Sequence, residues 1–247
     1  MTRWPEGYAL KHFAELDSTN DEARRLASNG ERGPLWILAD RQTKGRGRRG
    51  KSWETLSGNL AASLLLTPDK ATRECAQLSF VAALAVSDLV ATCLPGEDIR
   101  VKWPNDVLAG ERKIAGILLE SAGVGGDHLD WLAVGIGLNL VAYPADTEFP
   151  ATSLAALGAP AMDPLEACTH LASTWARWYA KWEASGFECV RESWLSRAAR
   201  LGMRIRARLA AGEATGVFEG IDEMGALLLR ESATHTRRIA AGEVYFG

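Results

Sequence analysis

Two nearly continuous apolar runs restrict the possible folds of this 247-residue chain more than any other feature of its sequence. They occupy residues 114–120 and 131–140, and neither alternates between polar and apolar side chains. A strand with one face in water shows that alternation, whereas a strand buried on both faces reads as a continuous apolar run. We therefore expect both runs to form central strands of a sheet that is covered on each side.

The remaining pattern predicts helices around that sheet and a different architecture near the end of the chain. Helices are expected at residues 16–28, 74–94, from Asp163 onward and at 187–199, and further strands at 35–39, 59–66 and 99–103. After Gly202 the apolar period changes to two, and short strands are expected at 203–209, 215–220, 226–230 and 244–246. Short strands so closely spaced are typical of a small β-barrel. The sequence thus predicts an α+β chain, with a mixed sheet flanked by helices over residues 1–200 and a barrel over residues 201–247.

The charge balance and the cysteine usage exclude several classes of function. With 28 basic and 31 acidic residues the net charge is −3, whereas a chain that coats nucleic acid is normally basic. The 4 cysteines and 4 histidines are dispersed without metal-ligand spacing, which excludes a zinc site or a disulfide framework. The first residues lack the apolar core of a signal peptide, and the apolar stretches are too short for a membrane span. We expect a soluble cytoplasmic protein without a nucleic-acid or membrane partner and without a protein-held metal ion.

A basic loop occupies residues 45–51 (GRGRRGK). Its glycines let the backbone approach a ligand closely, and its cations offer charge and forked donors to an anion. Because the loop contains no apolar side chain, we expect it to be mobile alone and to be ordered by an anionic ligand. Taken alone, these residues also fit a solvated basic turn or a nucleic-acid patch, although they do not have the spacing of a Walker A loop.

A second polar group surrounds the end of a predicted strand at residues 102–106 (KWPND). A Pro-Asn-Asp turn places polar side chains at a strand edge where ligands often bind, although an ordinary turn has the same sequence. Lys113 opens the next apolar strand and either turns to the rim or points into a pocket. Gly116, inside that strand, indicates a close approach by a ligand or by another backbone segment.

Three further features have a structural and a functional interpretation. Residues 17–20 (DSTN) precede a helix, and Thr19 is expected to cap it in a capping box with Glu22. The same helix start offers hydroxyls, an amide and N–H groups that suit a polar ligand head. Asn139 ends an apolar strand as a turn former or a ligand contact. Trp53 either stacks on adenine when the loop orders or packs in the core.

Taken together, these segments resemble the biotin protein ligase family. The matching segments are STN at 18–20, Q at 42, GRGRRGK at 45–51, KWPND at 102–106, KIAGIL from 113 and GIGLN at 135–139. Residues 216–229 also resemble the terminal barrel of that family. The resemblance covers nearly the whole chain, and it implies a core similar to the class II aminoacyl-tRNA synthetases followed by an SH3-like barrel.

The resemblance also implies roles for individual residues. The expected biotin-binding residues are Ser18, Thr19, Asn20, Gln42, Arg46, Gly47, Arg48, Lys113 and Gly116. The expected ATP-binding residues are Arg46, Arg48, Lys102, Asn105 and Asn139, with Trp53 added as a stacking partner for adenine. The catalytic candidates are Lys113 and Arg48, which cover the reacting anions, and Asp106, which orients the attacking amine.

On this interpretation the chain is a biotin–[biotin carboxyl-carrier protein] ligase. It would use ATP and Mg²⁺ to form biotinyl-5′-AMP and would transfer biotin to one lysine of a carboxylase carrier protein. A lipoate-type ligase and a non-catalytic biotin sensor or repressor remain as alternatives. Position 51 is Lys where the family usually has Arg. The DNA-binding domain of the bifunctional members is not seen either, and for that reason we expect no repressor activity. The sequence is compatible with a monomer or a homodimer.

Overall fold

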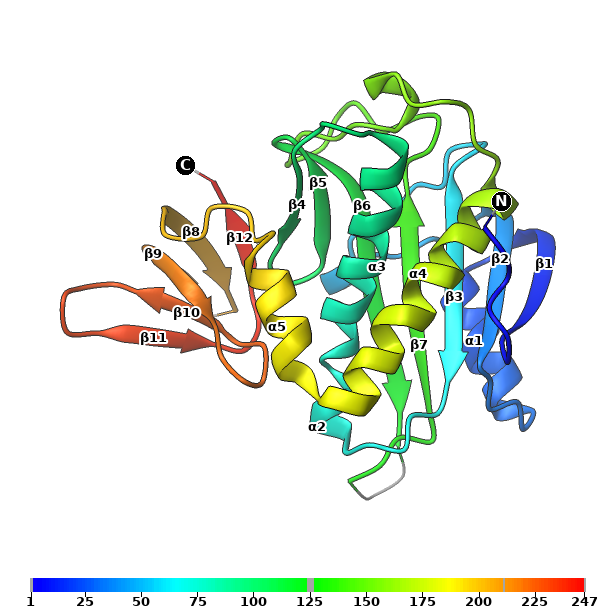
Figure 1. Cartoon of the computed structure of the whole chain (residues 1–247), viewed down its shortest axis with the longest axis horizontal. Helices are drawn as coiled ribbons and strands as arrows, with labels where there is room; N and C mark the ends of the chain where they lie inside the picture. Colours follow the sequence, from blue (N-terminus) through cyan, green and yellow to red (C-terminus); the bar gives the residue numbers. More distant parts are fainter. Residues whose placement is uncertain (1, 124–126, 211, 247) are drawn as a thin grey trace.

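The computed structural model describes residues 2–123, 127–210 and 212–246, which form two sheets (Figure 1). Within these residues the larger sheet has seven strands in the order β1-β2-β3-β7-β6-β5-β4. The strands are β1 (Ala9–Leu16), β2 (Leu35–Gln42), β3 (Leu60–Leu66), β4 (Ile99–Lys102), β5 (Asp106–Ala109), β6 (Arg112–Ala122) and β7 (Trp131–Leu138). β1 and β2 are parallel and the other neighbours are antiparallel, so the sheet is mixed, as predicted.

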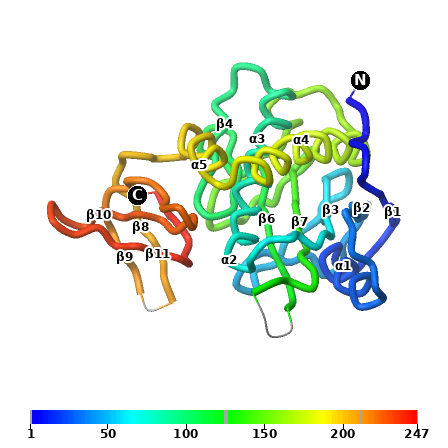
Figure 2. The backbone as a smooth tube through the Cα atoms, turned by 60° about the horizontal axis from the view of Figure 1, so that its bottom comes forward, coloured from blue at the N-terminus to red at the C-terminus, as the bar shows by residue number. Residues whose placement is uncertain are grey.

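Helices cover the two faces of this sheet unequally (Figures 1 and 2). α3 (Leu78–Cys93) and α4 (Pro164–Ser185) pack together on one face, and α1 (Thr19–Ser28) packs on the other. The shorter helices are α2 (Thr72–Cys75), α5 (Phe187–Leu195), η1 (Arg48–Gly50) and η2 (Ala155–Leu157). The stretch Thr72–Cys93 is long and apolar enough to cross a membrane, but 72% of its apolar window is buried inside the fold. The longer helix in this stretch, α3, is therefore a core helix, apolar on nearly all sides because protein surrounds it.

β7 lies between β3 and β6 in the middle of the sheet, which confirms the central position predicted from its apolar run. Val134 and Ile136 face the large core that includes α3 and α4, while Ala133 faces the smaller core under α1. Because successive residues of a strand point to opposite faces of the sheet, Gly135 and Gly137 lie on the same face as Ala133. Bare strand backbone is therefore presented on the α1 side of the sheet.

The C-terminal part of the chain forms the smaller sheet. Among the described residues it has five antiparallel strands in the order β11-β10-β9-β8-β12. The strands are β8 (Arg204–Leu209), β9 (Gly212–Ile221), β10 (Leu227–Arg230), β11 (Thr236–Ile239) and β12 (Glu243–Tyr245). Trp194 of α5 meets Phe218 of β9 edge to face, and Trp103 Nε1 donates to Gly225 O at 2.9 Å. The two sheets therefore share one continuous apolar core.

Three sequence-based predictions about local structure are wrong. The helix expected at 74–94 is interrupted, so that α2 and α3 form separately. β1, β5 and β11 were not predicted as strands. The N-cap of α1 is Ser18 rather than Thr19, and Ser18 makes no side-chain capping hydrogen bond. Thr19 does not form a capping box because its N–H and its hydroxyl both donate to Gln42 Oε1.

Candidate active site

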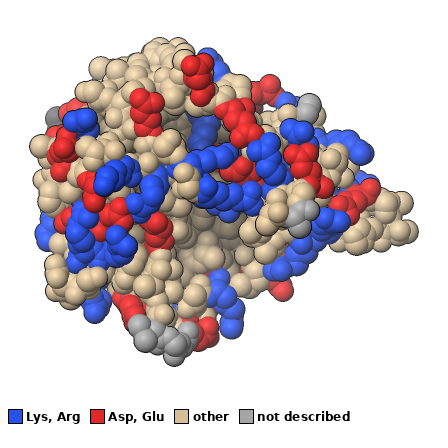
Figure 3. All heavy atoms as spheres, turned by 180° about the vertical axis from the view of Figure 1, so that it is seen from behind, with Lys and Arg blue, Asp and Glu red and all other residues tan. Residues whose placement is uncertain are grey.

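A cavity of about 440 Å³ opens on the α1 side of the larger sheet. It is bounded by the start of α1, the loop after β2, the β4–β5 turn, β6, β7 and residues 144–151, and β12 contributes from the smaller sheet. Figure 3 looks onto this hollow face and shows Lys and Arg side chains gathered across it. The sequence-predicted residues that line the cavity are Ser18, Thr19, Asn20, Gln42, Arg46, Gly47, Arg48, Trp53, Lys102, Asn105, Asp106, Lys113, Gly116 and Asn139. The fold thus brings the whole predicted set together, while the individual ligand assignments remain predictions.

One corner of the cavity is a buried network of hydroxyl and amide groups. Gln42 Oε1 accepts from Thr19 N–H at 2.8 Å and from the Thr19 hydroxyl at 3.1 Å. Ser63 Oγ, on β3, lies 2.7 Å from Thr19 Oγ1 and 2.6 Å from Asn20 Oδ1. Asn20 Nδ2 donates to Glu120 Oε2 at 2.7 Å. These mutual contacts hold polar groups in place before a ligand arrives, which favours recognition of a small polar head group.

The floor of the cavity is strand backbone covered by one aromatic ring. Gly116 on β6 pairs directly with Gly137 on β7. A Cβ atom added to Gly137 would lie 2.2 Å from Trp53 Cε2, and one added to Gly116 would lie 2.9 Å from Trp53 Cζ3. Gly116 is closely approached, but by the side chains of Trp53 and Lys113 and not by another backbone segment, so its contact with a ligand stays a prediction. Flat, apolar surfaces of this kind suit the hydrocarbon part of a ligand.

Next to this floor, one carboxylate lies between two lysines. Asp106 Oδ1 is 2.6 Å from Lys113 Nζ, and Asp106 Oδ2 is 3.4 Å from Lys102 Nζ. Burial opposes ionisation of Asp106, but the two ammonium groups outweigh burial and lower its pKa. Asp106 is therefore ionised at neutral pH. The three groups together carry one excess positive charge when Lys102 and Lys113 are protonated, which suits an anionic ligand.

Lys102 is enclosed mainly by aromatic rings. Its Nζ lies 4.1 Å from the Phe149 ring centre, 5.8 Å from that of Tyr245 and 5.9 Å from that of Phe246. Burial lowers the pKa of Lys102 although the Asp106 carboxylate acts in the opposite direction. The aromatic faces stabilise the ammonium group in part, because each ring presents negative charge density to it.

Residues 45–51, called the strap below, form a small hairpin over the cavity. Arg46 and Ser52 form an antiparallel bridge, and Gly47 N–H donates to Lys51 O at 2.7 Å. The strap contains no apolar side chain, as noted from the sequence, and ionic contacts hold it instead. Arg46 contacts Asp21 and lies 3.3 Å from Glu120 Oε1. The hydrogen bond from Arg46 lowers the pKa of Asp21.

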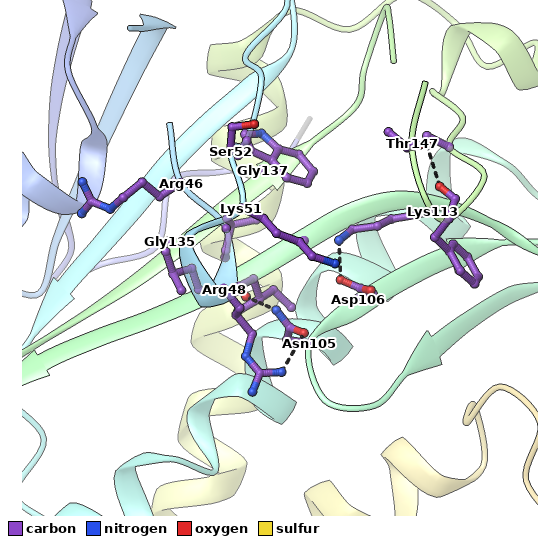
Figure 4. Close-up of a pocket in the computed structure, with 18 of the residues that line it drawn as sticks. Arg46, Arg48, Lys51, Ser52, Asn105, Asp106, Lys113, Gly135, Gly137 and Thr147 are labelled. Carbon is purple, nitrogen blue, oxygen red and sulfur yellow. Dashed lines mark hydrogen bonds and ion pairs between the residues drawn. The ribbon is translucent and has the colours of Figure 1, made fainter. Parts of the chain in front are cut away.

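The two arginines that were predicted to cover anions point in different directions (Figure 4). Arg46 extends away from the lysines, toward the carboxylates of α1 and β6. Arg48 lies 3.5 Å from Asn105 Oδ1 and donates to Gly242 O at 3.2 Å. Arg48 is therefore the arginine of the strap whose charge faces the β4–β5 turn, and Arg46 anchors the first end of the strap.

The second end of the strap is anchored by Lys51. Its Nζ lies 3.1 Å from Glu148 Oε2 and 3.1 Å from Glu243 Oε2. Tyr245 donates its hydroxyl to the same two carboxylates, at 2.7 Å to Glu243 and 3.1 Å to Glu148. Burial, followed by the Glu243 carboxylate, raises the pKa of Tyr245 to about 12, so this hydroxyl remains a donor at neutral pH.

The cavity does not contain a protein-made metal centre within the described part of the chain. No group of three or more His, Cys, Asp or Glu residues there is placed to hold a metal ion. Asp106 contacts two lysines, and Glu148 and Glu243 both contact Lys51. These carboxylates are therefore engaged by cations of the protein.

Several residues that shape the site were not predicted from the sequence. They are Asp21, Ser63, Glu120, Gly135, Gly137, Glu148, Phe149, Glu243 and Tyr245. The two glycines carried a usable signal, because alternate glycines inside an apolar strand indicate a close approach to one face. The other residues reach the site only through tertiary contacts, which no local sequence pattern reports. The predicted residue Asn139 is also fixed by such a contact, because its Nδ2 donates to Thr152 O at 2.9 Å.

Comparisons with known proteins agree along the chain. The biotin/lipoate A/B protein ligase family model matches residues 13–139, and the biotin protein ligase C-terminal domain model matches residues 201–247. A biotin–[acetyl-CoA-carboxylase] ligase from Paracoccus denitrificans is 46% identical over 95% of this chain and 99% of its own length. The bifunctional ligase/repressor BirA of Bacillus subtilis is 32% identical over 98% of this chain and 75% of its own length. The structure of the biotin protein ligase from Aquifex aeolicus in complex with biotin and ATP has a TM-score of 0.80 at 30% identity, covering 96% of this chain and 97% of that chain.

Proposed function

This chain belongs to the biotin protein ligase family, and we propose that it is a biotin–[acetyl-CoA-carboxylase] ligase (EC 6.3.4.15). It activates biotin with ATP as biotinyl-5′-AMP and transfers the biotinyl group to a lysine of a biotin carboxyl carrier protein. Membership of the family and the similarity to a solved complex with biotin and ATP support this activity and both small substrates.

The observation that carries the proposal is the order of groups inside one cavity. The polar corner around Thr19 and Ser63, the flat glycine floor and the lysine pair around Asp106 adjoin one another on the same sheet face. Biotin has the matching sequence of parts: a polar ureido head, an apolar ring and chain, and a carboxylate. We assign the corner to the ureido head and the lysine pair to the carboxylate end.

In the first step a biotin carboxylate oxygen bonds to the α-phosphorus of ATP. The bond from that phosphorus to the bridging oxygen breaks, and pyrophosphate leaves with its electron pair. Two anions must approach each other, so positive charge from Lys102, Lys113 and Arg48 is the central requirement. Asp106 holds both lysines in position through its ion pairs. Mg²⁺ enters with ATP as part of the substrate, coordinated by phosphate oxygens and water.

In the second step the neutral amine of the carrier lysine attacks the acyl carbon of the mixed anhydride. The bond to the phosphate oxygen breaks, AMP leaves, and the amine loses a proton. Asp106 is our candidate for orienting that amine, since it is an ionised acceptor beside the carboxylate end. A closed strap excludes water, which would otherwise hydrolyse the anhydride.

Exchange of labelled pyrophosphate into ATP tests the first step. Exchange should require biotin, and labelled biotin should then appear on a lysine of a carrier domain. Lipoate in place of biotin should support neither reaction. Exchange with lipoate alone would assign the chain to the lipoate-type ligases, and binding of biotin without exchange would make it a sensor.

A further inference from the structure

The smaller sheet contacts the strap directly, at the start of its last strand. Lys51 Nζ lies 3.1 Å from Glu243 Oε2 at the first residue of β12, and Arg48 donates to the preceding Gly242 O at 3.2 Å. Both contacts join the strap to residues about 190 positions later in the chain. The position of the strap therefore depends on where β12 lies.

Glu243 is the more buried of the two carboxylates that share Lys51, and Glu148 is also paired with Arg208 at 2.8 Å. The Glu243 side chain is 18% exposed, against 46% for Glu148. Tyr245, on the same strand, donates to Glu243 Oε2 at 2.7 Å. Burial opposes ionisation of Glu243, but Tyr245 and Lys51 outweigh it and lower the pKa of this carboxyl group. β12 thus presents an oriented, ionised acceptor to the strap.

The strap has few other means of staying closed. It has no apolar side chain, so hydrophobic burial contributes little to its closure. Its first end is held by Arg46 on Asp21 and Glu120, which lie on α1 and β6. Its second end is held by Lys51 and Arg48 on β12 and its neighbours. If the contacts of Lys51 and Arg48 were lost, the strap would remain attached only through Arg46 and could swing away from the cavity about that end.

We propose that Glu243 is a positioning residue for the reaction: through Lys51 it holds the strap closed over the cavity, so that the smaller sheet controls retention of the acyl-adenylate. The adenylate part of this proposal rests on the proposed function, whereas the closure of the strap does not. Glu243 lines the cavity and contacts Lys51 of the strap, and the proposal assigns it no direct role toward the reacting carboxylate or the phosphate.

Trypsin digestion tests closure without reference to activity, because the exposed Arg49 lies within the strap. Glu243→Gln should increase the initial rate of cleavage within the strap about fivefold, in line with a partly exposed ion pair. Glu213→Gln, which removes an exposed carboxylate of the same sheet that pairs with Arg206 and Arg208, should leave that rate unchanged. Equal cleavage in wild type and Glu243→Gln would overturn the proposal.

Release of preformed biotinyl-5′-AMP tests the consequence. Glu243→Gln and Lys51→Gln should each accelerate release about fivefold, and the double variant should release no faster than the faster single variant. The rate of single-turnover adenylate formation should change far less than the rate of release. Lys51→Arg, which keeps the charge, should release the adenylate as slowly as wild type. If the two accelerations of release multiplied in the double variant, Glu243 would not act through Lys51. If wild type forms no adenylate, the proposed function fails, and the trypsin experiment still decides whether Glu243 closes the strap.

Discussion

Replacing Gly137 by alanine should weaken biotin binding more than it weakens the fold. The added Cβ would lie 2.2 Å from Trp53 Cε2 and 2.4 Å from both Cζ2 and Nε1. These separations are far inside van der Waals contact, so the indole must move away. Gly137 lies in a regular strand and has no positive φ, so its backbone conformation tolerates alanine. The perturbation is therefore confined to the contact between the floor and Trp53.

The size of the effect on biotin binding depends on whether β7 or Trp53 moves to relieve the clash. β7 is held on both sides by β3 and β6, whereas Trp53 follows a strap that is held mainly by polar contacts. Overpacking of this kind costs about 1–3 kcal/mol. If the clash destabilises the arrangement in which Trp53 lies against Gly137 by this amount, biotin affinity falls about 5- to 150-fold. The melting temperature should fall by no more than about 4 °C, because the open loop relieves the clash.

Isothermal titration calorimetry with biotin measures the affinity, and differential scanning calorimetry measures the stability. Trp53→Ala supplies the matched control, because it removes the ring that the new methyl group would meet. Gly137→Ala should therefore have almost no further effect in the Trp53→Ala background. Wild-type affinity in Gly137→Ala, or an undiminished loss in the double variant, would refute the reasoning.

Three further substitutions test other parts of the site and the fold. Lys113→Ala should reduce biotin-dependent pyrophosphate exchange about 100-fold or more, because a cation beside the reacting anions is lost; unchanged exchange would rule out its role. Arg48→Gly should release biotinyl-5′-AMP faster in a filtration assay, since the contacts to Asn105 and Gly242 disappear, and unaltered retention would contradict this. The Arg25 guanidinium lowers the pKa of Asp17 from 3.8 to about 2, so its stabilising effect is full above pH 3.8 and is lost as pH falls toward 2. Asp17→Asn should consequently flatten the decline of melting temperature in that window, and an equally steep decline would show that another group causes it.

A sequence-based prediction succeeded where neighbouring residues alone fix the structure, and it failed where contacts distant in the sequence decide it. The apolar runs at 114–120 and 131–140 lie within β6 and β7 or extend just past them, and both strands are internal to the sheet. β7 is buried at most positions, as a continuous apolar run predicts. β6 is only partly buried from Leu118 onward, so burial on both faces was predicted wrongly for that part of the run. β1 was not predicted because it is an edge strand without a fully buried residue, so it shows little apolar periodicity. β5 has only four residues after a turn, too few to establish a period.

Local sequence alone determined which segments carry the glycines, hydroxyls and cations of this protein, and those segments were specific enough to indicate its family and its reaction. Only the tertiary structure decided which cations face the cavity. Arg46 and Arg48 are two positions apart, yet Arg46 turns to Asp21 while Arg48 turns to the β4–β5 turn. Lys51 finds Glu243 at a separation of 192 positions. Ion pairs form through space over a few ångströms, whereas a sequence pattern reports only neighbours within a helical turn or along one strand.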